Sequence, residues 1–225
     1  MGLLSDLLYP ENPKLRQNVQ DLADSIAGDI RFIEKATNDT IERINIFLDV
    51  KCDKVDSSGK TVDAFLLDVQ RAFEQLGRNA EKQYKQLSAT VDTTVIEKVR
   101  RNVLGFDLRR MREAVQELQI AGISMEMAVL VVGLAVTTVV TAILTTTVCV
   151  AASVIGGILA GGGVGLIVYA VLEAINGAME RKELERRVRE LEKAEKTIRD
   201  NRNAIVDCAE RLREALIVIR VMAAS

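Results

Sequence analysis

The sequence contains no histidine and no tryptophan, and only two of its 225 residues are prolines. The absence of histidine excludes a Ser-His-Asp triad, a Cys-His dyad, an HExxH protease and a zinc deaminase, because each needs an imidazole. Aromatic residues make up 4% of the chain and the net charge is -2, unlike the basic composition of a nucleic-acid binder. We therefore expect a non-enzymatic protein without a cofactor, a metal site, a nucleic-acid partner or a small-molecule substrate.

Charge is absent from one long stretch, residues 127–172, which we call the uncharged segment. Its 46 residues comprise 32 apolar residues, seven glycines, six threonines and one serine. As a single helix this segment would extend about 69 Å, whereas the hydrocarbon core of a bilayer is about 30 Å thick. The length therefore predicts two membrane-crossing arms, residues 128–147 and 153–172, joined by a turn near residues 148–153.

Glycines recur at every fourth position from Gly157 to Gly165 in the second arm, and Ala170 and Ala174 follow at the same spacing from each other. Such a stripe lets another helix approach closely within a membrane and predicts a helix–helix seam. The alternative is that the three consecutive glycines at 161–163 form the turn, which would leave the second arm too short to cross. The residues expected to form the seam are Gly157, Gly161, Gly165, Ala170 and Ala174.

Basic residues flank the uncharged segment on both sides. A hairpin places both flanks on one side of the membrane, and the positive-inside rule predicts that this side is cytoplasmic. The N-terminal and C-terminal helices are then cytoplasmic as well. The flanking residues are Arg109, Arg110 and Arg112 before the segment, and Arg181, Lys182, Arg186 and Arg187 after it.

The cysteines and the N-terminus favour an intracellular membrane protein. Cys52, Cys149 and Cys208 are odd in number and at least 59 residues apart, which predicts reduced thiols that pack as small core residues. Reduced thiols are typical of a reducing compartment. The first eight residues hold Asp6 and lack a basic region, so we expect no signal peptide.

Outside the uncharged segment, apolar residues recur at helical spacing. We expect a first helix from Asn12-Pro13, a loop over residues 51–60, a second helix from Thr61, a third from Asp92 or Thr93 through Leu118, and a long C-terminal helix. Polar residues interrupt the apolar stripe of the last helix at Glu195 and Arg202, which is typical of positions that fix register.

These patterns predict an all-α fold, an elongated antiparallel helical bundle or coiled coil with a long hydrophobic helical hairpin. Three regions are expected. Residues 1–119 form amphipathic helices, residues 120–179 form the hydrophobic hairpin, and residues 180–225 form a coiled-coil helix that packs on the N-terminal helices.

The N-terminal stretch LSDLLYPENPK, residues 4–14, resembles the start of the single-pass membrane and coiled-coil domain-containing protein 3 family. The chain length of 225, the late glycine-rich apolar run and the residues Ile175, Gly177, Ala178 and Glu180 are also similar. The resemblance implies a membrane-associated helical protein with coiled coils, and it supplies no functional residues to carry over. The uncharged segment departs from the family name, since it is long enough for two crossings.

Three functions remain open on the sequence alone. The first is a non-enzymatic membrane protein anchored by the hairpin, whose cytoplasmic helices bind a protein partner or further copies of the chain. The second is an α-helical pore-forming protein that conceals the hairpin in a soluble form and inserts it on oligomerisation. The third is a fully soluble bundle in which the uncharged segment forms the core. The lipid bilayer is the expected partner of the first two.

Overall fold

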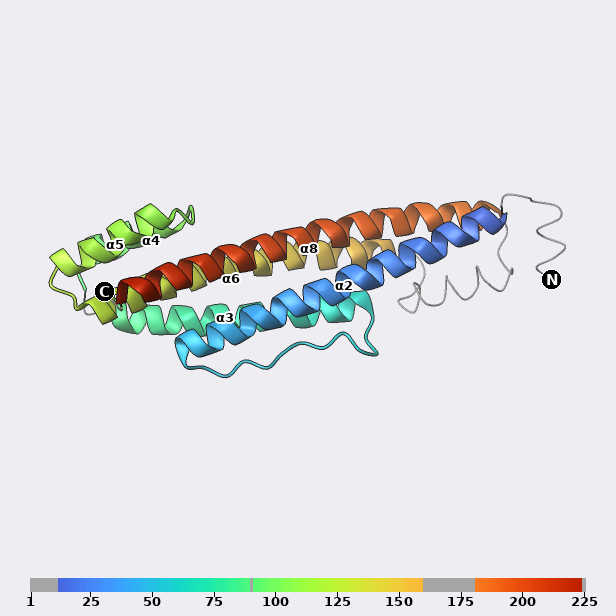
Figure 1. The fold of residues 1–225 in the computed structure, drawn as a ribbon. Helices are drawn as coiled ribbons and strands as arrows, with labels where there is room; N and C mark the ends of the chain where they lie inside the picture. The colour runs from blue at the N-terminus through green and yellow to red at the C-terminus, as the bar shows by residue number, and fades with distance from the viewer. Residues whose placement is uncertain (1–11, 90, 160–180, 224–225) are drawn as a thin grey trace.

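The computed structural model describes residues 12–89, 91–159 and 181–223, and these are helical apart from short connections (Figure 1). The all-α bundle expected from the sequence is confirmed, and the described residues contain no strand. The helices are α2 (Asn12–Leu48), α3 (Val62–Ser88), α4 (Thr93–Val103), α5 (Leu108–Ile120), α6 (Met125–Leu159) and α8 (Arg181–Ala223).

The four long helices α2, α3, α6 and α8 lie side by side. α6 is antiparallel to the other three (Figure 1). α2 and α8 are parallel to each other. Ser25 contacts Glu195 and Asp29 contacts Arg202, so a later residue of α2 meets a later residue of α8. α3 packs mainly on α6, and α6 also packs on α8. The C-terminal helix thus packs on the first N-terminal helix, while α4 and α5 form a short hairpin at one end (Figure 1).

The loop between α2 and α3 runs back along α2, which allows the two helices to point the same way (Figure 1). Asn45 and Asn38 on α2 each exchange two hydrogen bonds with loop backbone, at Cys52 and Val55 respectively, with lengths of 2.8–3.0 Å. Because these amides satisfy backbone groups of the loop, the loop stays packed along α2. The loop predicted over residues 51–60 is confirmed.

Side-chain caps fix several helix ends at the predicted places. Thr61 caps α3 by accepting from the backbone N–H of Ala64, and Asp92 caps α4 by accepting from Thr94. The predicted third helix is wrong in one respect, because the chain breaks at residues 104–107 and α5 starts afresh after Asp107. Phe106 adopts a left-handed backbone with φ of 52°, which ends α4 and reverses the chain.

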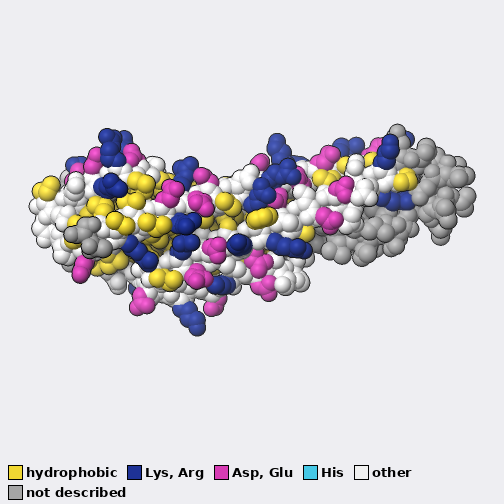
Figure 2. Space-filling model, in the orientation of Figure 1, with side chains coloured by type: hydrophobic (Ala, Val, Ile, Leu, Met, Phe, Trp, Pro, Cys, Tyr) yellow, Lys and Arg dark blue, Asp and Glu magenta, His cyan; other side chains and the backbone are white. Residues whose placement is uncertain are grey.

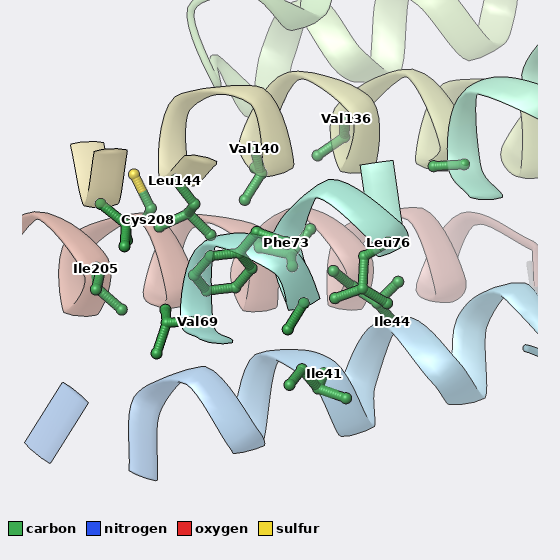
Figure 3. Close-up of a cluster of buried hydrophobic side chains, with 14 of the residues drawn as sticks. Ile41, Ile44, Val69, Phe73, Leu76, Val136, Val140, Leu144, Ile205 and Cys208 are labelled. Carbon is green, nitrogen blue, oxygen red and sulfur yellow. The ribbon is translucent and has the colours of Figure 1, made fainter. Parts of the chain in front are cut away.

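The apolar stripes of the six described helices meet in one continuous core. Figure 3 shows the part of it where α2, α3, α6 and α8 meet. Burial raises the pKa of the Cys52 and Cys208 thiols, so both cysteines are protonated at neutral pH and behave as small core residues, as predicted. Cys149 differs because it lies exposed on α6. Among the fully buried core side chains are Ile33, Ile41, Ile44, Phe65, Phe73, Leu76, Leu134, Leu144, Ile198, Ile205 and Leu212.

A cluster of charged residues interrupts the apolar contact between α2 and α8. Asp29 is only 5% exposed, and its carboxylate accepts a 2.5 Å hydrogen bond from Arg202 and lies 4.0 Å from Arg199. Glu195, also buried, pairs with Arg199 and accepts a 2.8 Å bond from Ser25. A buried carboxylate tolerates only a register that supplies its partners, so this cluster sets how α2 lies along α8.

Replacing Asp29 by alanine should lower the free energy of unfolding by about 2 kcal/mol. Removing one partner of a fully buried ion pair costs about 3–5 kcal/mol, and the loss here is smaller because Arg199 and Arg202 retain access to water. Urea denaturation followed by circular dichroism measures it. Asp21→Ala, at an exposed carboxylate on the same helix, is the control and should change stability by less than about 0.5 kcal/mol. Equal losses in the two variants would contradict a structural role for Asp29.

Candidate membrane-inserting helix

α6 contains the whole predicted first arm, residues 128–147, and has one charged residue, Glu126 in its first turn. Five of its six threonines donate a hydrogen bond to a backbone carbonyl of the same helix. The hydroxyl of Thr137 donates to the Gly133 carbonyl and that of Thr141 to the Thr137 carbonyl, both at 2.8 Å. Because these hydroxyls need no water, α6 is compatible with an apolar surrounding of either protein or lipid.

The first half of α6 is enclosed by protein. Residues 128–141 are nearly all buried, and α3, α8, α4 and α5 pack around them. Two glycines permit the closest approaches. A side chain at Gly133 would meet the ring of Phe47 at 2.1 Å, and one at Gly77 of α3 would meet the Thr141 hydroxyl at 2.9 Å. The core of the bundle is therefore built around this half of α6.

The second half of α6 is only partly covered. Val150 is 59% exposed, and the exposed positions recur every three or four residues along one side of the helix. We call this side the outer face. It carries no charge, in contrast to the exposed sides of α2, α3 and α8. The outer face consists of Ala142, Ile143, Thr146, Cys149, Val150, Ser153 and Gly157.

Next to the outer face, a groove of about 500 Å³ separates α6 from α8. Its α6 side is mostly apolar, with Val150 and Val154, whereas its α8 side presents Asp200 and Asn201. The Asn201 amide donates a 3.1 Å hydrogen bond to the Thr147 carbonyl, and its buried oxygen has no hydrogen-bond partner. The contact between α8 and the second half of α6 therefore contains both a groove and a buried oxygen whose burial is not offset by a hydrogen bond.

The structure corrects the position predicted for the turn. α6 continues without interruption through residues 148–153 and ends at Leu159, so no turn lies there. The expected seam residues Gly161, Gly165, Ala170 and Ala174 lie outside the described residues, as does the alternative turn at 161–163. Gly157 lies on α6, and a side chain built there meets nothing within 4 Å. The membrane seam proposed for these residues stays a prediction.

The two basic flanks lie at opposite ends of the bundle (Figure 1). α6 starts next to the first flank and extends about 52 Å toward the end of the bundle where the second flank lies. The first flank belongs to α5. The second opens α8, where glutamates at positions 183, 185 and 190 pair with Arg181, Arg186 and Arg187. The cytoplasmic side expected for both flanks stays a prediction.

Other signs of chemistry are missing from the described part of the chain. No group of three or more metal-binding side chains comes together there. One helix, Met125–Ile158, is long and apolar enough to cross a membrane, and two-thirds of its most apolar stretch is buried, as in the core helix of a soluble protein. Comparison of the chain with known protein families, curated proteins and solved structures finds no match. The arguments about function therefore depend on α6 and its surroundings.

Proposed function

We propose that this chain is a non-enzymatic, membrane-associated protein that keeps α6 covered in a water-soluble helical bundle and delivers it to a lipid bilayer. The observation that carries the proposal is the outer face of α6, which is exposed to solvent yet uncharged over residues 142–157. Soluble proteins place charged side chains on exposed helix faces, because charge keeps the surface in water.

The packing around α6 favours a concealed helix over a permanently inserted one. α3 and α8 bury their apolar stripes on α6 and carry charged residues on their other sides. With α6 in the hydrocarbon and this packing intact, those charges would enter the bilayer at a cost of about 2.5–3.5 kcal/mol each. Insertion therefore requires that both α3 and α8 separate from the inserting part of α6, and a groove beside Asn201 already lies between α8 and α6.

Two native cysteines provide opposite readouts of insertion. Cys149 lies on the outer face, and Cys208 on α8 is buried in the same apolar cluster as Leu144 of α6 (Figure 3). A membrane-impermeant maleimide should label Cys149 readily and Cys208 slowly in solution. When vesicles are added, labelling of Cys149 should slow about tenfold or more as lipid covers it, and labelling of Cys208 should accelerate as α8 leaves α6. Single-cysteine variants measured separately give the two rates.

The same experiment separates the competing functions. If the protein is found only in membranes without detergent and Cys208 is always reactive, the chain is a constitutive anchor and the concealed state is wrong. If vesicles change neither rate, the chain is a closed soluble bundle. Release of a trapped dye together with the reciprocal labelling would make the inserted form a pore, whereas reciprocal labelling without release would make it an anchor that inserts on contact.

A further inference from the structure

We infer that the corner between α4 and α5 is a docking site for anionic lipid membranes. The corner comprises residues 100–112, which hold five arginines and a single acidic residue, Asp107, in a chain whose net charge is -2. The arginines stand on both sides of the break, in the last turn of α4 and the first turns of α5, and all five are exposed. They are Arg100, Arg101, Arg109, Arg110 and Arg112.

The tip of this corner is apolar. Leu104 is 58% exposed, while Phe106 is half-buried against the core. Phe106 holds its left-handed backbone although bulky side chains rarely adopt it, and the residue before it is Gly105. An exposed leucine between arginines suits the interface of a bilayer. There, the apolar side chain would enter the acyl region and the guanidinium groups would stay among the phosphates.

Positive charge at the start of α5 is only partly neutralised, because Arg109 and Arg110 each lie 3.8 Å from a single carboxylate, that of Glu113 and Asp107 respectively. Arg109 and Arg110 occupy the first turn, where the positive end of the helix dipole repels cations, and the first turn has no acidic residue. Asp107 precedes the helix and caps it, accepting hydrogen bonds from the backbone N–H groups of both arginines at 2.9 and 3.4 Å. Because Asp107 already occupies these N–H groups, lipid phosphate would pair with the exposed guanidinium groups and reduce the repulsion between them.

A bilayer fits this surface better than a nucleic acid does. An exposed aliphatic tip has no partner on a phosphodiester backbone, whereas a membrane receives both the tip and the arginines. Figure 2 shows Lys and Arg side chains, with Asp and Glu among them, over the end of the molecule that carries α4 and α5. The same hairpin covers the enclosed half of α6, so docking would bring lipid to the cover of the concealed helix. The inference builds on the proposed membrane association, although docking and insertion are separate events.

Sedimentation of the full chain with vesicles tests the site. We expect binding to vesicles with 30% phosphatidylserine and little binding to pure phosphatidylcholine vesicles. The variant Arg101→Gln/Arg109→Gln should bind anionic vesicles about 25-fold more weakly, since one arginine near such a surface contributes about 5-fold. The matched control is Arg71→Gln/Arg78→Gln on α3. These side chains are 73% and 69% exposed, against 70% and 78% at the corner, and all four have a carboxylate partner three or four residues away.

The apolar tip has its own pair of variants. Leu104→Ser should weaken binding about 5-fold or more at high salt, where charge is screened, and Ile46→Ser at an exposed position of α2 should not. Equal losses in corner and control variants, or equal binding to neutral vesicles, would overturn the docking site. Docking without a change in the labelling of Cys149 and Cys208 would support the corner and contradict insertion. Reciprocal labelling that survives the corner variant would contradict the corner and support insertion.

Discussion

Val150→Asp should leave the bundle folded and reduce insertion of α6 into vesicles by about 100-fold. Val150 is more than half exposed on the outer face, so a carboxylate there keeps its contact with water in the soluble form. In the bilayer the same carboxylate would lie near the middle of the stretch 142–159, where an aspartate costs about 2.5–3.5 kcal/mol. Unchanged circular dichroism together with loss of Cys149 protection by vesicles is the expected result.

The control for this prediction is Val206→Asp, which makes the same exchange at an exposed valine of α8. Because Val206 lies on a charged helix that is not expected to enter lipid, insertion should stay within about twofold of the native chain. If both aspartates reduce insertion equally, then added negative charge repels the vesicles and position on α6 does not matter. If neither does, the outer face is not the surface that enters the membrane.

Gly133→Leu should destabilise the bundle by about 3 kcal/mol. The first side-chain carbon would lie 2.1 Å from the ring of Phe47, and the rest of the leucine would need the space that this ring occupies. Overpacking of a buried site costs about 1–3 kcal/mol and occasionally more, and here a whole side chain enters a full core. The free energy of unfolding in urea measures the loss. Adding Phe47→Ala to the same chain should recover most of it, because the obstructing ring is then gone.

Gly157→Leu is the matched control in the same helix. No atom lies within 4 Å of a side chain built at this position, so the leucine meets no obstacle. Since glycine in a helix interior costs about 0.5–1 kcal/mol relative to alanine, the variant should be as stable as the native protein or slightly more so. A loss at Gly157 as large as at Gly133 would mean that the two halves of α6 are equally enclosed, contrary to their burial.

The sequence predicts the helices well where apolar spacing and capping residues agree. Thr61 and Asp92 have hydroxyl or carboxylate side chains before an apolar stripe, and both cap helices. The break at residues 104–107 was missed because the apolar spacing continues across it from Val103 to Met111. Its signal is Gly105, yet the reversal itself occurs at Phe106, in a conformation that aromatic residues seldom adopt.

The composition of the uncharged segment identifies the helix that forms the candidate site, whereas the argument from its length places the turn wrongly. The uncharged segment does contain the helix with an uncharged exposed face, but the turn was placed by comparison with the thickness of a bilayer. In the bundle, α3, α8 and the α4–α5 hairpin bury the first half of α6, so the helix needs no turn at 148. The close approach at Gly133 has no sequence signature, because an isolated helical glycine does not indicate which neighbour it admits.

The boundary between the enclosed and partly exposed halves of α6, near Thr141, also sets the length of the partly exposed half. Residues 142–159 extend about 27 Å, close to the roughly 30 Å of a hydrocarbon core. The partly exposed half alone is thus long enough to cross a bilayer while residues 128–141 stay packed in the bundle. Entry into lipid and withdrawal from it would then require that α3 and α8 separate from residues 142–159 while the packing around residues 128–141 persists, which makes a reversible attachment compatible with a permanently folded body.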